Sequence, residues 1–317
     1  MSTCSVAMAT YNGAVYLEAQ LRSIATQARP PDEVVIADDG STDGTLDIVR
    51  RVAADMPCPV VVVEGGGRLG PVGNFERALR NVTTEVVFLC DQDDLWHQEK
   101  VAILMERFER DAAVGGIFSD GLIVSDDQAL RDRSLWDTVG FTPDEQRSFS
   151  ADPLQVLLRR NVVTGASLAF RSALLALVLP FPYGGWHDLS IAILIASTST
   201  LELCDRRLIS YRLHQANAAG LATGSRRSQM LDRPAHLANL DAQQLHWSSL
   251  RARMAKFHAS ADVLIRVDEK LAHLARRRAL PRRRLARVGP AIGELVSGRY
   301  TTYAAGPWSL VRDVVGP

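Results

Sequence analysis

The sequence predicts an α/β fold in which a mostly parallel central sheet carries helices on both faces and is followed by a C-terminal helical extension. In the first 120 residues, short runs of β-branched residues alternate with segments of helical periodicity, the pattern of parallel strands joined by helices. After about Ala219 the composition changes to Ala, Leu, Arg and His, with little strand signal. The 317 residues, of which 47% are hydrophobic and 23% charged, suit a globular protein with a sizeable core.

The N-terminal part alternates between strands and helices. Apolar runs predict strands at about 5–9, 34–37, 60–63, 86–90 and 116–118. Apolar residues spaced by three and four predict helices at about 17–28, 46–53, 74–80 and 99–110. Pro30-Pro31 ends the first helix. Asp43 is a suitable N-cap for the second helix, because its carboxylate can accept hydrogen bonds from the first turn.

The pattern weakens after residue 119. The stretch from about Asp120 to Ser150 is polar and irregular, and we expect it to be an excursion from the sheet. A helix is expected at 153–160, a strand at 166–170 and a helix at 189–196, with weaker strand candidates at 200–204 and 207–213. We therefore expect one domain over residues 1–219, divided near residue 120, and a basic helical region over residues 220–317.

The formal net charge of zero conceals two opposite regions. Residues 1–220 contain 19 basic and 29 acidic side chains, whereas residues 221–317 contain 17 basic and 7 acidic ones. Seven arginines lie between Arg276 and Arg287. They form either a solvated helix face or a contact with an anionic membrane surface, and we favour the membrane contact. Nucleic acid is not expected as a partner, because no interleaved aromatic residues or recognised module accompany the patch.

The sequence shows neither a membrane-spanning segment nor an export signal. Its longest apolar-leaning stretch, Leu189–Leu203, is interrupted by Ser and Thr and is shorter than the roughly 20 residues that span a bilayer. The N-terminus lacks the basic and apolar regions of a signal peptide. The four cysteines form no CxxC pair, as expected of reduced thiols. We expect a cytoplasmic protein, with peripheral contact at the inner face of the plasma membrane if the arginines bind lipid.

Polar clusters follow three of the predicted strands. They are Tyr11-Asn12, Asp38-Asp39 and Asp91-Gln92-Asp93-Asp94. Ligands of open parallel sheets bind at the carboxyl ends of the strands, so we expect the three clusters to share one edge. Taken alone, Asp38-Asp39-Gly40-Ser41 could equally be an ordinary turn.

The acidic cluster after the fourth strand is the most informative of the three. Its crowded carboxylates must either raise the pKa of one member or bind a cation. Mg²⁺ or Mn²⁺ fits, because both ions accept carboxylate oxygens together with substrate phosphates. No GxGxxG follows a strand, and neither GxxxxGK[ST] nor GxSxG is present. Phosphates would then be neutralised mainly by metal, and the leading hypothesis is a nucleotide-diphosphate site.

Seven short stretches, in this order and spacing, resemble the family 2 glycosyltransferases. They are Val6–Gly13, Val34–Thr45, Leu69–Phe75, Phe88–Trp96, Val163–Gly165, Trp186–Asp188 and Tyr211–His214. The resemblance covers about residues 4–217 and implies the GT-A fold, which is Rossmann-like, and inverting transfer from a nucleotide-sugar. Residues 1–119 would then be the nucleotide-binding half and residues 120–219 the acceptor half.

A rhamnosyltransferase-like subgroup of this family is similar in further detail. The similarity lies in the stretch Cys90–Trp96, the later His187-Asp188, the motif from Tyr211 to Asn217 and the closing segment from Gly298 to Asp313. Enzymes of that subgroup build bacterial surface polysaccharides. The resemblance therefore implies transfer of rhamnose or a related hexose from a dTDP- or UDP-sugar to a saccharide, with a lipid-linked saccharide as one option.

The resemblance also implies roles for residues on the donor side. Ala9 and Tyr11 would line the base pocket, and Asp39, with Asp38 beside it, would accept hydrogen bonds from a uracil or thymine edge. Arg68 would approach the nucleotide. Two further sets would handle the diphosphate: the DxD pair, Asp91 and Asp93, as the Mn²⁺ or Mg²⁺ site, and the later residues Arg212 and His214.

On the acceptor side, the resemblance assigns the general base to Asp188. Thr164 and Gly165 would shape the acceptor site. His187, which replaces the Glu of many relatives, is either a polar residue at a helix start or an acceptor contact. Trp186 either packs in the core or stacks on a sugar ring.

An inverting transfer is a single displacement, which needs one carboxylate to take the acceptor proton and a divalent ion to offset the charge of the leaving diphosphate. Processive relatives have transmembrane helices and a QxxRW signature, both of which this sequence lacks, so one sugar would be moved per encounter. Two alternatives stay open: a catalytically degenerate nucleotide-sugar-binding subunit and a sugar nucleotidyltransferase. The sequence leaves the oligomeric state open.

Overall fold

The computed structural model describes residues 1–65, 67–125, 127, 130–131, 133–214 and 233–316. The chain forms two compact units. Unit 1 comprises residues 1–143, 163–181 and 199–221, and unit 2 comprises residues 144–162, 182–198 and 222–317. The boundary that the sequence predicts at residues 219 and 220 lies outside the described residues.

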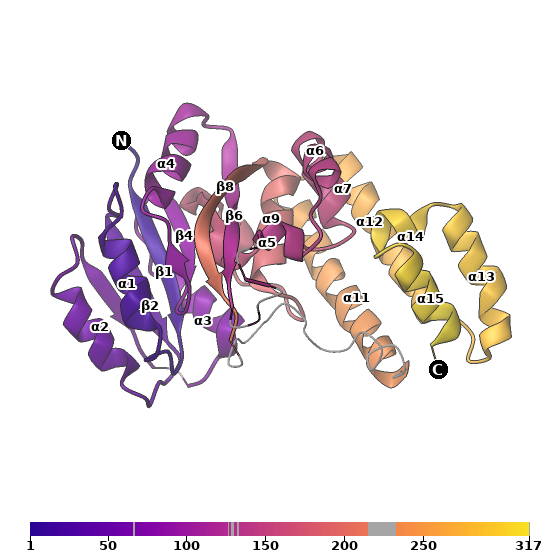
Figure 1. The fold of residues 1–317 in the computed structure, drawn as a ribbon. Coiled ribbons are helices and arrows are strands. Elements are labelled where there is room, and N and C mark those ends of the chain that lie inside the picture. The colour runs from indigo at the N-terminus through magenta and orange to yellow at the C-terminus, as the bar shows by residue number, and fades with distance from the viewer. Residues whose placement is uncertain (66, 126, 128–129, 132, 215–232, 317) are drawn as a thin grey trace. The chain divides into compact units, whose positions relative to one another are not determined.

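Unit 1 is built on an eight-stranded sheet with the order β3-β2-β1-β4-β7-β6-β8-β5. Its strands β1, β2, β4, β6 and β8 are labelled in Figure 1. Strands β3, β2, β1 and β4 are mutually parallel, β6 and β8 pair in parallel, and β7 is antiparallel to both β4 and β6. The predicted mostly parallel sheet is therefore confirmed. The strands are β1 Cys4–Thr10, β2 Glu33–Asp38, β3 Val60–Val63, β4 Val86–Asp91, β5 Leu95–Trp96, β6 Val114–Val124, β7 Leu168–Arg171 and β8 Thr200–Arg212.

Helices cover both faces of this sheet, as the sequence predicts. Side chains alternate between the faces of a strand. Val6 and Met8 of β1, with their partners on β2 and β4, share one core with α1, α2 and α4. The other face packs against α3, whose Asn74 donates hydrogen bonds to the carbonyls of Thr10 and Ala37. These helices are α1 Leu17–Ala25, α2 Thr45–Ala53, α3 Gly70–Leu79 and α4 Lys100–Arg110.

The predicted N-cap of α2, Asp43, is wrong. The N-cap of α2 is Gly44, with φ of +88°, a backbone conformation that favours glycine. Asp43 instead accepts hydrogen bonds from the Thr45 amide and hydroxyl and from the Ala14 amide, so it ties the loop before α1 to the start of α2.

The expected excursion over residues 120–150 is partly regular structure. Strand β6 runs on to Val124, followed by α5 Leu135–Thr138 and α6 Pro143–Ala151. The buried carboxylate of Asp120 organises the return of the chain. It accepts hydrogen bonds from the Ser134 hydroxyl and the Trp136 amide. A polar composition is misleading here because one Asp satisfies several backbone and side-chain donors.

Unit 2 is helical, in agreement with the predicted change of composition. Helix α9 is buried around most of its circumference and packs against α7 and α11. Helices α11 and α12 pack together, as do α13, α14 and α15. The remaining bounds are α7 Pro153–Leu157, α9 His187–Thr198, α11 Arg233–Lys256, α12 Ala261–Arg278, α13 Arg284–Val296, α14 Arg299–Tyr303 and α15 Pro307–Val315. Among the described helices, none combines the length and apolar character needed to cross a membrane.

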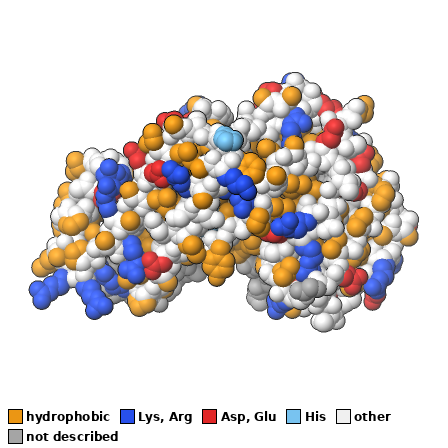
Figure 2. Space-filling model, turned by 180° about the vertical axis from the view of Figure 1, so that it is seen from behind, with side chains coloured by type: hydrophobic (Ala, Val, Ile, Leu, Met, Phe, Trp, Pro, Cys, Tyr) orange, Lys and Arg blue, Asp and Glu red, His pale blue; other side chains and the backbone are white. Residues whose placement is uncertain are grey.

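Basic and hydrophobic side chains lie next to one another over the C-terminal helices, at the left of the view in Figure 2. The predicted patch from Arg276 to Arg287 is not uniformly exposed, however, and this is a correction. Arg277 is buried and binds both carboxylate oxygens of Asp313, with distances of 2.7 and 3.2 Å. Arg287 is also buried, where its guanidinium donates to backbone carbonyls.

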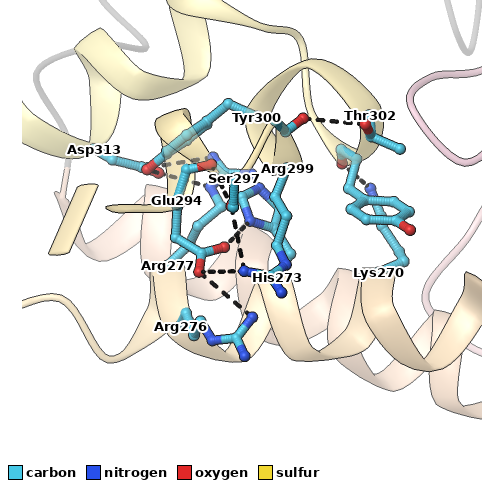
Figure 3. Close-up of polar contacts among 12 residues, drawn as sticks. Lys270, His273, Arg276, Arg277, Glu294, Ser297, Arg299, Tyr300, Thr302 and Asp313 are labelled. Atoms are coloured by element: carbon cyan, nitrogen blue, oxygen red, sulfur yellow. Dashed lines mark hydrogen bonds and ion pairs between the residues drawn. The ribbon is translucent and has the colours of Figure 1, made fainter. Parts of the chain in front are cut away.

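Asp313 and Glu294 are each the centre of a group of buried charges among the described residues of unit 2 (Figure 3). Asp313 also accepts hydrogen bonds from the Tyr300 hydroxyl at 2.7 Å and pairs with His236 at 2.8 Å. Glu294 pairs with His273 at 2.8 Å and lies 3.4 and 3.3 Å from Arg276 and Arg299. Charged side chains are buried at tolerable cost only when they are paired, and these pairs join α11, α12, α13, α14 and α15.

Candidate active site

The three polar clusters meet at the carboxyl edge of the sheet in unit 1. The parallel register pairs Thr10 of β1 with Asp38 of β2, and Ala9 of β1 with Asp91 of β4. The loops that follow β1, β2 and β4 therefore start side by side, as the sequence predicts.

Gln92 ties the first of these loops to the third. Its side chain accepts a hydrogen bond from the Tyr11 amide at 2.9 Å and donates one to the Tyr11 carbonyl at 3.1 Å. A Cβ on Gly13 would lie 2.2 Å from the side-chain amide oxygen of Gln92, so a larger residue there would displace Gln92 from its hydrogen bonds with Tyr11. The sequence placed Gln92 in the acidic cluster but gave no sign of this bridging role.

The two aspartates at the end of β2 are both buried and accept hydrogen bonds from the loop that follows. Asp38 accepts hydrogen bonds from the Thr10 hydroxyl and from the Ser41 amide and hydroxyl. Asp39 accepts hydrogen bonds from the Leu69 amide at 2.6 Å and the Gly70 amide at 2.8 Å. A carboxylate has about four acceptor positions, so these bonds leave Asp39 with capacity for a further donor.

An aromatic and basic pair lies beside Asp39. The Arg68 guanidinium stacks over the Tyr11 ring at 4.0 Å from its centroid. Arg77, which the sequence reading missed, donates to the Asp38 carbonyl at 2.9 Å and lies 3.8 Å from the Asp39 carboxylate. The structure thus brings together Tyr11, Asp39 and Arg68, three of the predicted nucleotide contacts.

The end of β8 joins the acidic cluster to α1. The ring of His214 approaches the Asp93 carboxylate at 2.8 Å, and the Arg212 Nε donates to the Asp93 carbonyl at 2.9 Å. Tyr16, the N-cap of α1, stacks on His214 at 4.6 Å and lies 4.6 Å below the Arg212 guanidinium. Asp93 is therefore in direct contact with Arg212 and His214, although the sequence predicted these residues separately.

The last member of the acidic cluster, Asp94, is buried beneath the edge. One of its oxygens accepts a hydrogen bond from the Arg212 amide at 3.0 Å. Burial, followed by the charges of Asp91 and Asp93, raises the pKa of Asp94 well above its ordinary value. The carboxylate crowding expected from the sequence therefore acts on Asp94.

Lys100 is fully buried below the same cluster and was also missed. Its ammonium donates to the Ala166 carbonyl at 2.7 Å and lies 3.8 Å from the Trp96 ring centroid. Burial lowers the pKa of Lys100 to about 7, against the opposing effect of nearby acidic groups. A signal was present in the sequence, because Lys100 lies four and eight residues before Leu104 and Phe108, on the apolar face of α4.

Thr164 and Gly165 lie in unit 1 at the start of a short 3₁₀ helix, η1 Gly165–Ser167. The Thr164 carbonyl accepts hydrogen bonds from the Ser167 amide and hydroxyl. Gly165 is buried, and the next residue supplies the carbonyl that binds Lys100. The turn that contains Thr164 and Gly165 is therefore next in sequence to the carbonyl that binds Lys100.

The residues predicted for the chemical step lie in unit 2. Asp188 is in the first turn of α9, where the Leu189 amide donates to its carboxylate at 2.6 Å. Burial raises the pKa of Asp188 to about 6, although hydrogen bonds from the Leu189 amide and the Asn161 side chain oppose the shift. A carboxylate with a pKa near 6 is suited to accept a proton near neutral pH. Asn161 was not predicted from the sequence.

The two neighbours of Asp188 differ sharply in exposure. His187 is buried, and burial lowers its pKa to about 4, so its imidazole is neutral at pH 7. Trp186 is 49% exposed. Exposure argues against core packing as the role of Trp186 and leaves its ring available to a ligand.

No group of three or more His, Cys, Asp or Glu side chains among the described residues is arranged to enclose a metal ion. A cation at Asp91 and Asp93 would therefore need oxygens from a substrate or from water. Mg²⁺ typically binds in this manner, through one or two carboxylates and substrate phosphates.

Residues 5–163 match the model of the family described as "Glycosyl transferase family 2". The chain belongs to this family, and the GT-A fold expected from the resemblance is confirmed by its similarity to a solved structure. That structure is the mannosyltransferase PcManGT from Pyrobaculum calidifontis in complex with GDP-Man and Mn²⁺. The TM-score is 0.57 at 21% sequence identity, with 99% of this chain and 86% of that chain covered.

Two curated relatives are similar in sequence. An uncharacterized glycosyltransferase of Nostoc sp. is 27% identical over 220 residues, which is 67% of this chain and 65% of the relative. The dTDP-rhamnosyl transferase RfbG of Shigella flexneri is 37% identical over 98 residues, which is 30% of this chain and 34% of the relative. The chain thus covers less than two thirds of the length of either relative.

Proposed function

We propose that this protein is an inverting, metal-dependent, non-processive glycosyltransferase. It moves rhamnose or a related hexose from a dTDP- or UDP-sugar to a saccharide acceptor, with cell-surface polysaccharide as the product class. The observation that carries this proposal is the contact of Asp93 with His214 and Arg212 at the carboxyl edge of the sheet. A carboxylate beside basic groups at this edge suits a metal-bound diphosphate.

The nucleotide is proposed to bind beside this group. Ala9 and Tyr11 line the base pocket, Arg68 covers it from its stacked position on Tyr11, and Asp39 accepts a hydrogen bond from the base. Asp38 holds the loop that carries Asp39. The similarity to a dTDP-rhamnosyl transferase supports a thymidine or uridine donor, whereas the mannosyltransferase of similar fold was solved with GDP-Man. Because that likeness extends to the fold alone, we keep dTDP and UDP as the proposed nucleotides.

Asp91 and Asp93 would hold the divalent cation, Mn²⁺ or Mg²⁺. The fit rests on the chemistry of the donor set, since paired carboxylates without a complete protein shell leave room for phosphate oxygens. When bound, such a cation offsets the negative charge that develops on the leaving diphosphate. Arg212 and His214 are proposed to contact the same diphosphate, and Tyr16 keeps their side chains in place by stacking.

Asp188 is proposed as the general base. In a single displacement the acceptor hydroxyl oxygen forms a bond to C1 of the sugar while the bond from C1 to the diphosphate oxygen breaks. Asp188 takes the hydroxyl proton, and the raised pKa of its carboxylate suits that step. Thr164, Gly165, Trp186 and the neutral His187 are proposed to shape the acceptor side, with Trp186 available to stack on a sugar ring.

A thermal-shift screen of nucleotide-sugars, with Mn²⁺, with Mg²⁺ and with EDTA, tests the donor site. A ligand at 100 times its Kd stabilises a protein by about 2.7 kcal/mol, so a bound dTDP- or UDP-sugar should raise the Tm by several degrees with metal only. The variant Asp93→Asn should lose this shift. Asp47→Asn, an exposed aspartate on α2 with a side chain 79% exposed, should keep it.

The screen, together with assays of nucleoside diphosphate release and of nucleoside triphosphate formation, separates the proposal from its rivals. Equal Tm shifts with EDTA and with Mn²⁺ would overturn the metal site. Donor binding without release of nucleoside diphosphate in the presence of acceptors would favour a degenerate binding subunit. Pyrophosphate-dependent formation of nucleoside triphosphate would indicate a sugar nucleotidyltransferase.

A further inference from the structure

Helix α13 turns its apolar residues outward. Its buried stripe consists of Arg287, Ala291 and Glu294. The exposed stripe is Leu285, Val288, Ile292 and Val296, spaced by three and four residues, with Leu285 90% and Val296 82% exposed. A surface helix ordinarily buries its apolar stripe and exposes its charges, so this arrangement is reversed.

Specific contacts hold the two charged side chains of this segment inside the unit. Arg287 donates hydrogen bonds to the carbonyls of Pro281 and Arg282 at 2.8 and 2.7 Å. Glu294 faces His273, Arg276 and Arg299, as Figure 3 shows. No other charged residue occurs between Leu285 and Val296. The outward surface of this segment is consequently uncharged.

Helix α15, which packs against α13, is similar. Trp308, Val311 and Val315 are exposed at spacings of three and four residues, and Trp308 is 68% exposed. Eight of the seventeen large hydrophobic side chains exposed among the described residues lie on these two helices. Such concentration marks an interaction surface rather than scattered exposure.

The exposed charges of the chain after Glu269 favour an anionic partner. Arg282, Arg283 and Arg284 are exposed at the start of α13. After Glu269 the chain contains only two acidic residues, Glu294 and Asp313, and both are buried. The exposed charges of this segment are therefore positive.

We propose that this surface docks on an anionic lipid bilayer. The docking face consists of Arg282–Arg284 together with the exposed apolar residues of α13 and α15. An apolar helix face beside clustered basic residues binds in the plane of a bilayer surface, and exposed Trp is typical of the membrane–water boundary. A second copy docked through the same face would also cover the apolar stripe, but it would bring the positive charges of Arg282–Arg284 of both copies to one interface without acidic partners.

Flotation with lipid vesicles tests this proposal on the full chain. Vesicles of phosphatidylcholine with about 30% phosphatidylglycerol present an anionic surface and should bind the protein. Vesicles of pure phosphatidylcholine should bind it weakly. The triple change Arg282→Gln, Arg283→Gln and Arg284→Gln should weaken anionic binding by about 100-fold. The triple change Leu285→Ser, Ile292→Ser and Val296→Ser should weaken it by at least about tenfold.

Matched variants in other elements control for charge and hydrophobicity. Arg50→Gln, Arg80→Gln and Arg110→Gln remove the same charge from exposed sites in unit 1. Val61→Ser, Leu245→Ser and Ile265→Ser remove exposed apolar side chains from β3, α11 and α12. Both controls should bind vesicles like the unchanged protein. The altered residues of the docking face are exposed, so its variants should keep the Tm.

Three results would overturn the proposal. The first is equal binding to neutral and anionic vesicles, and the second is unchanged binding of both docking-face variants. The third is a lipid-free dimer, detected by light scattering, that the serine variant converts to monomers, because the apolar face would then serve a second copy. Vesicle binding is independent of nucleotide-sugar binding, so failure of the proposed function would leave this test unaffected.

Discussion

The carboxylate of Asp188 is the single group on which the proposed chemistry depends most. Burial raises its pKa to about 6, and only the deprotonated form can accept a proton. We expect kcat/KM to rise about tenfold per pH unit below pH 6 and to level off above it. The measurement is the rate of nucleoside diphosphate release from pH 4.5 to 8. A profile that is flat across pH 5–7 would remove Asp188 as the base.

The variant Asp188→Asn sharpens this test because it keeps the shape of the side chain. Transfer should fall by about 10²-fold or more while donor affinity changes little. Asp262→Asn is the matched control, since Asp262 also lies in the first turn of a helix and its side chain is 78% exposed. Normal turnover by Asp188→Asn, or an equal loss in the control, would contradict the assignment.

Deprotonation of the same carboxylate, which the proposed reaction requires, lowers the free energy of unfolding. Its pKa in the folded state lies above the ordinary value of 3.8, so the folded state binds the proton more tightly than the unfolded chain. The free energy of unfolding therefore falls as the pH rises from about 4 to 6. At pH 7.5, Asp188→Asn should raise it by about 1–2 kcal/mol, measured by urea unfolding. A destabilised variant at that pH would contradict the burial argument.

Individual site residues were predictable where they belong to a short motif in the sequence. Asp91 and Asp93 were predicted from the acidic cluster, and Arg212 and His214 from the family resemblance; Asp93 is in contact with both Arg212 and His214. Tyr16 was not predicted, because its contact with His214 joins residues that only the sheet brings together. A pairwise contact between distant positions leaves no periodic signal in one sequence.

At the scale of elements, the C-terminal helices depend on one buried carboxylate. Asp313 of α15 binds Arg277 of α12, Tyr300 of α14 and His236 of α11. Although burial opposes ionisation, the hydrogen bonds from His236 and Arg277 outweigh it and lower the pKa of Asp313. Its contribution to stability is therefore present at neutral pH and is lost as the pH falls through that lowered value.

Removing this carboxylate should loosen the helices that it joins. Asp313→Ala leaves Arg277 buried without its partner, a change that typically costs about 3–5 kcal/mol. Hydrogen exchange should show faster amide exchange in α11, α12, α14 and α15, with unit 1 unchanged. Protection equal to that of the unchanged protein in these helices would show that Asp313 does not hold them together.

The regular strands and helices of unit 1 were predictable because propensity and hydrophobic periodicity agree in them. Strand β3 was predicted with its observed bounds, and β1, β2 and β4 to within a residue at either end. The extension of β6 and the helices α5 and α6 were not, because the hydrogen bonds of Asp120 override a polar composition. The exposure of the apolar stripe of α13 could not be predicted either, since periodicity locates an apolar face without showing whether that face is buried.

For the whole molecule, zero net charge describes neither region. The acidic part contains the sheet edge with Asp91 and Asp93, and the basic part ends in helices whose only acidic side chains after Glu269 are buried. We infer that the two regions bind different partners: the acidic edge binds a metal-bound nucleotide-sugar, and the basic helices bind an anionic lipid surface.

Proton NMR of the reaction with the preferred donor and Mg²⁺ tests the central claim most directly. We expect the transferred sugar to have the anomeric configuration opposite to that in the donor, and Asp188→Asn to form the product about 10²-fold more slowly or worse. Product with the donor's configuration, or product formed at the same rate by the variant, would contradict inverting transfer with Asp188 as the base.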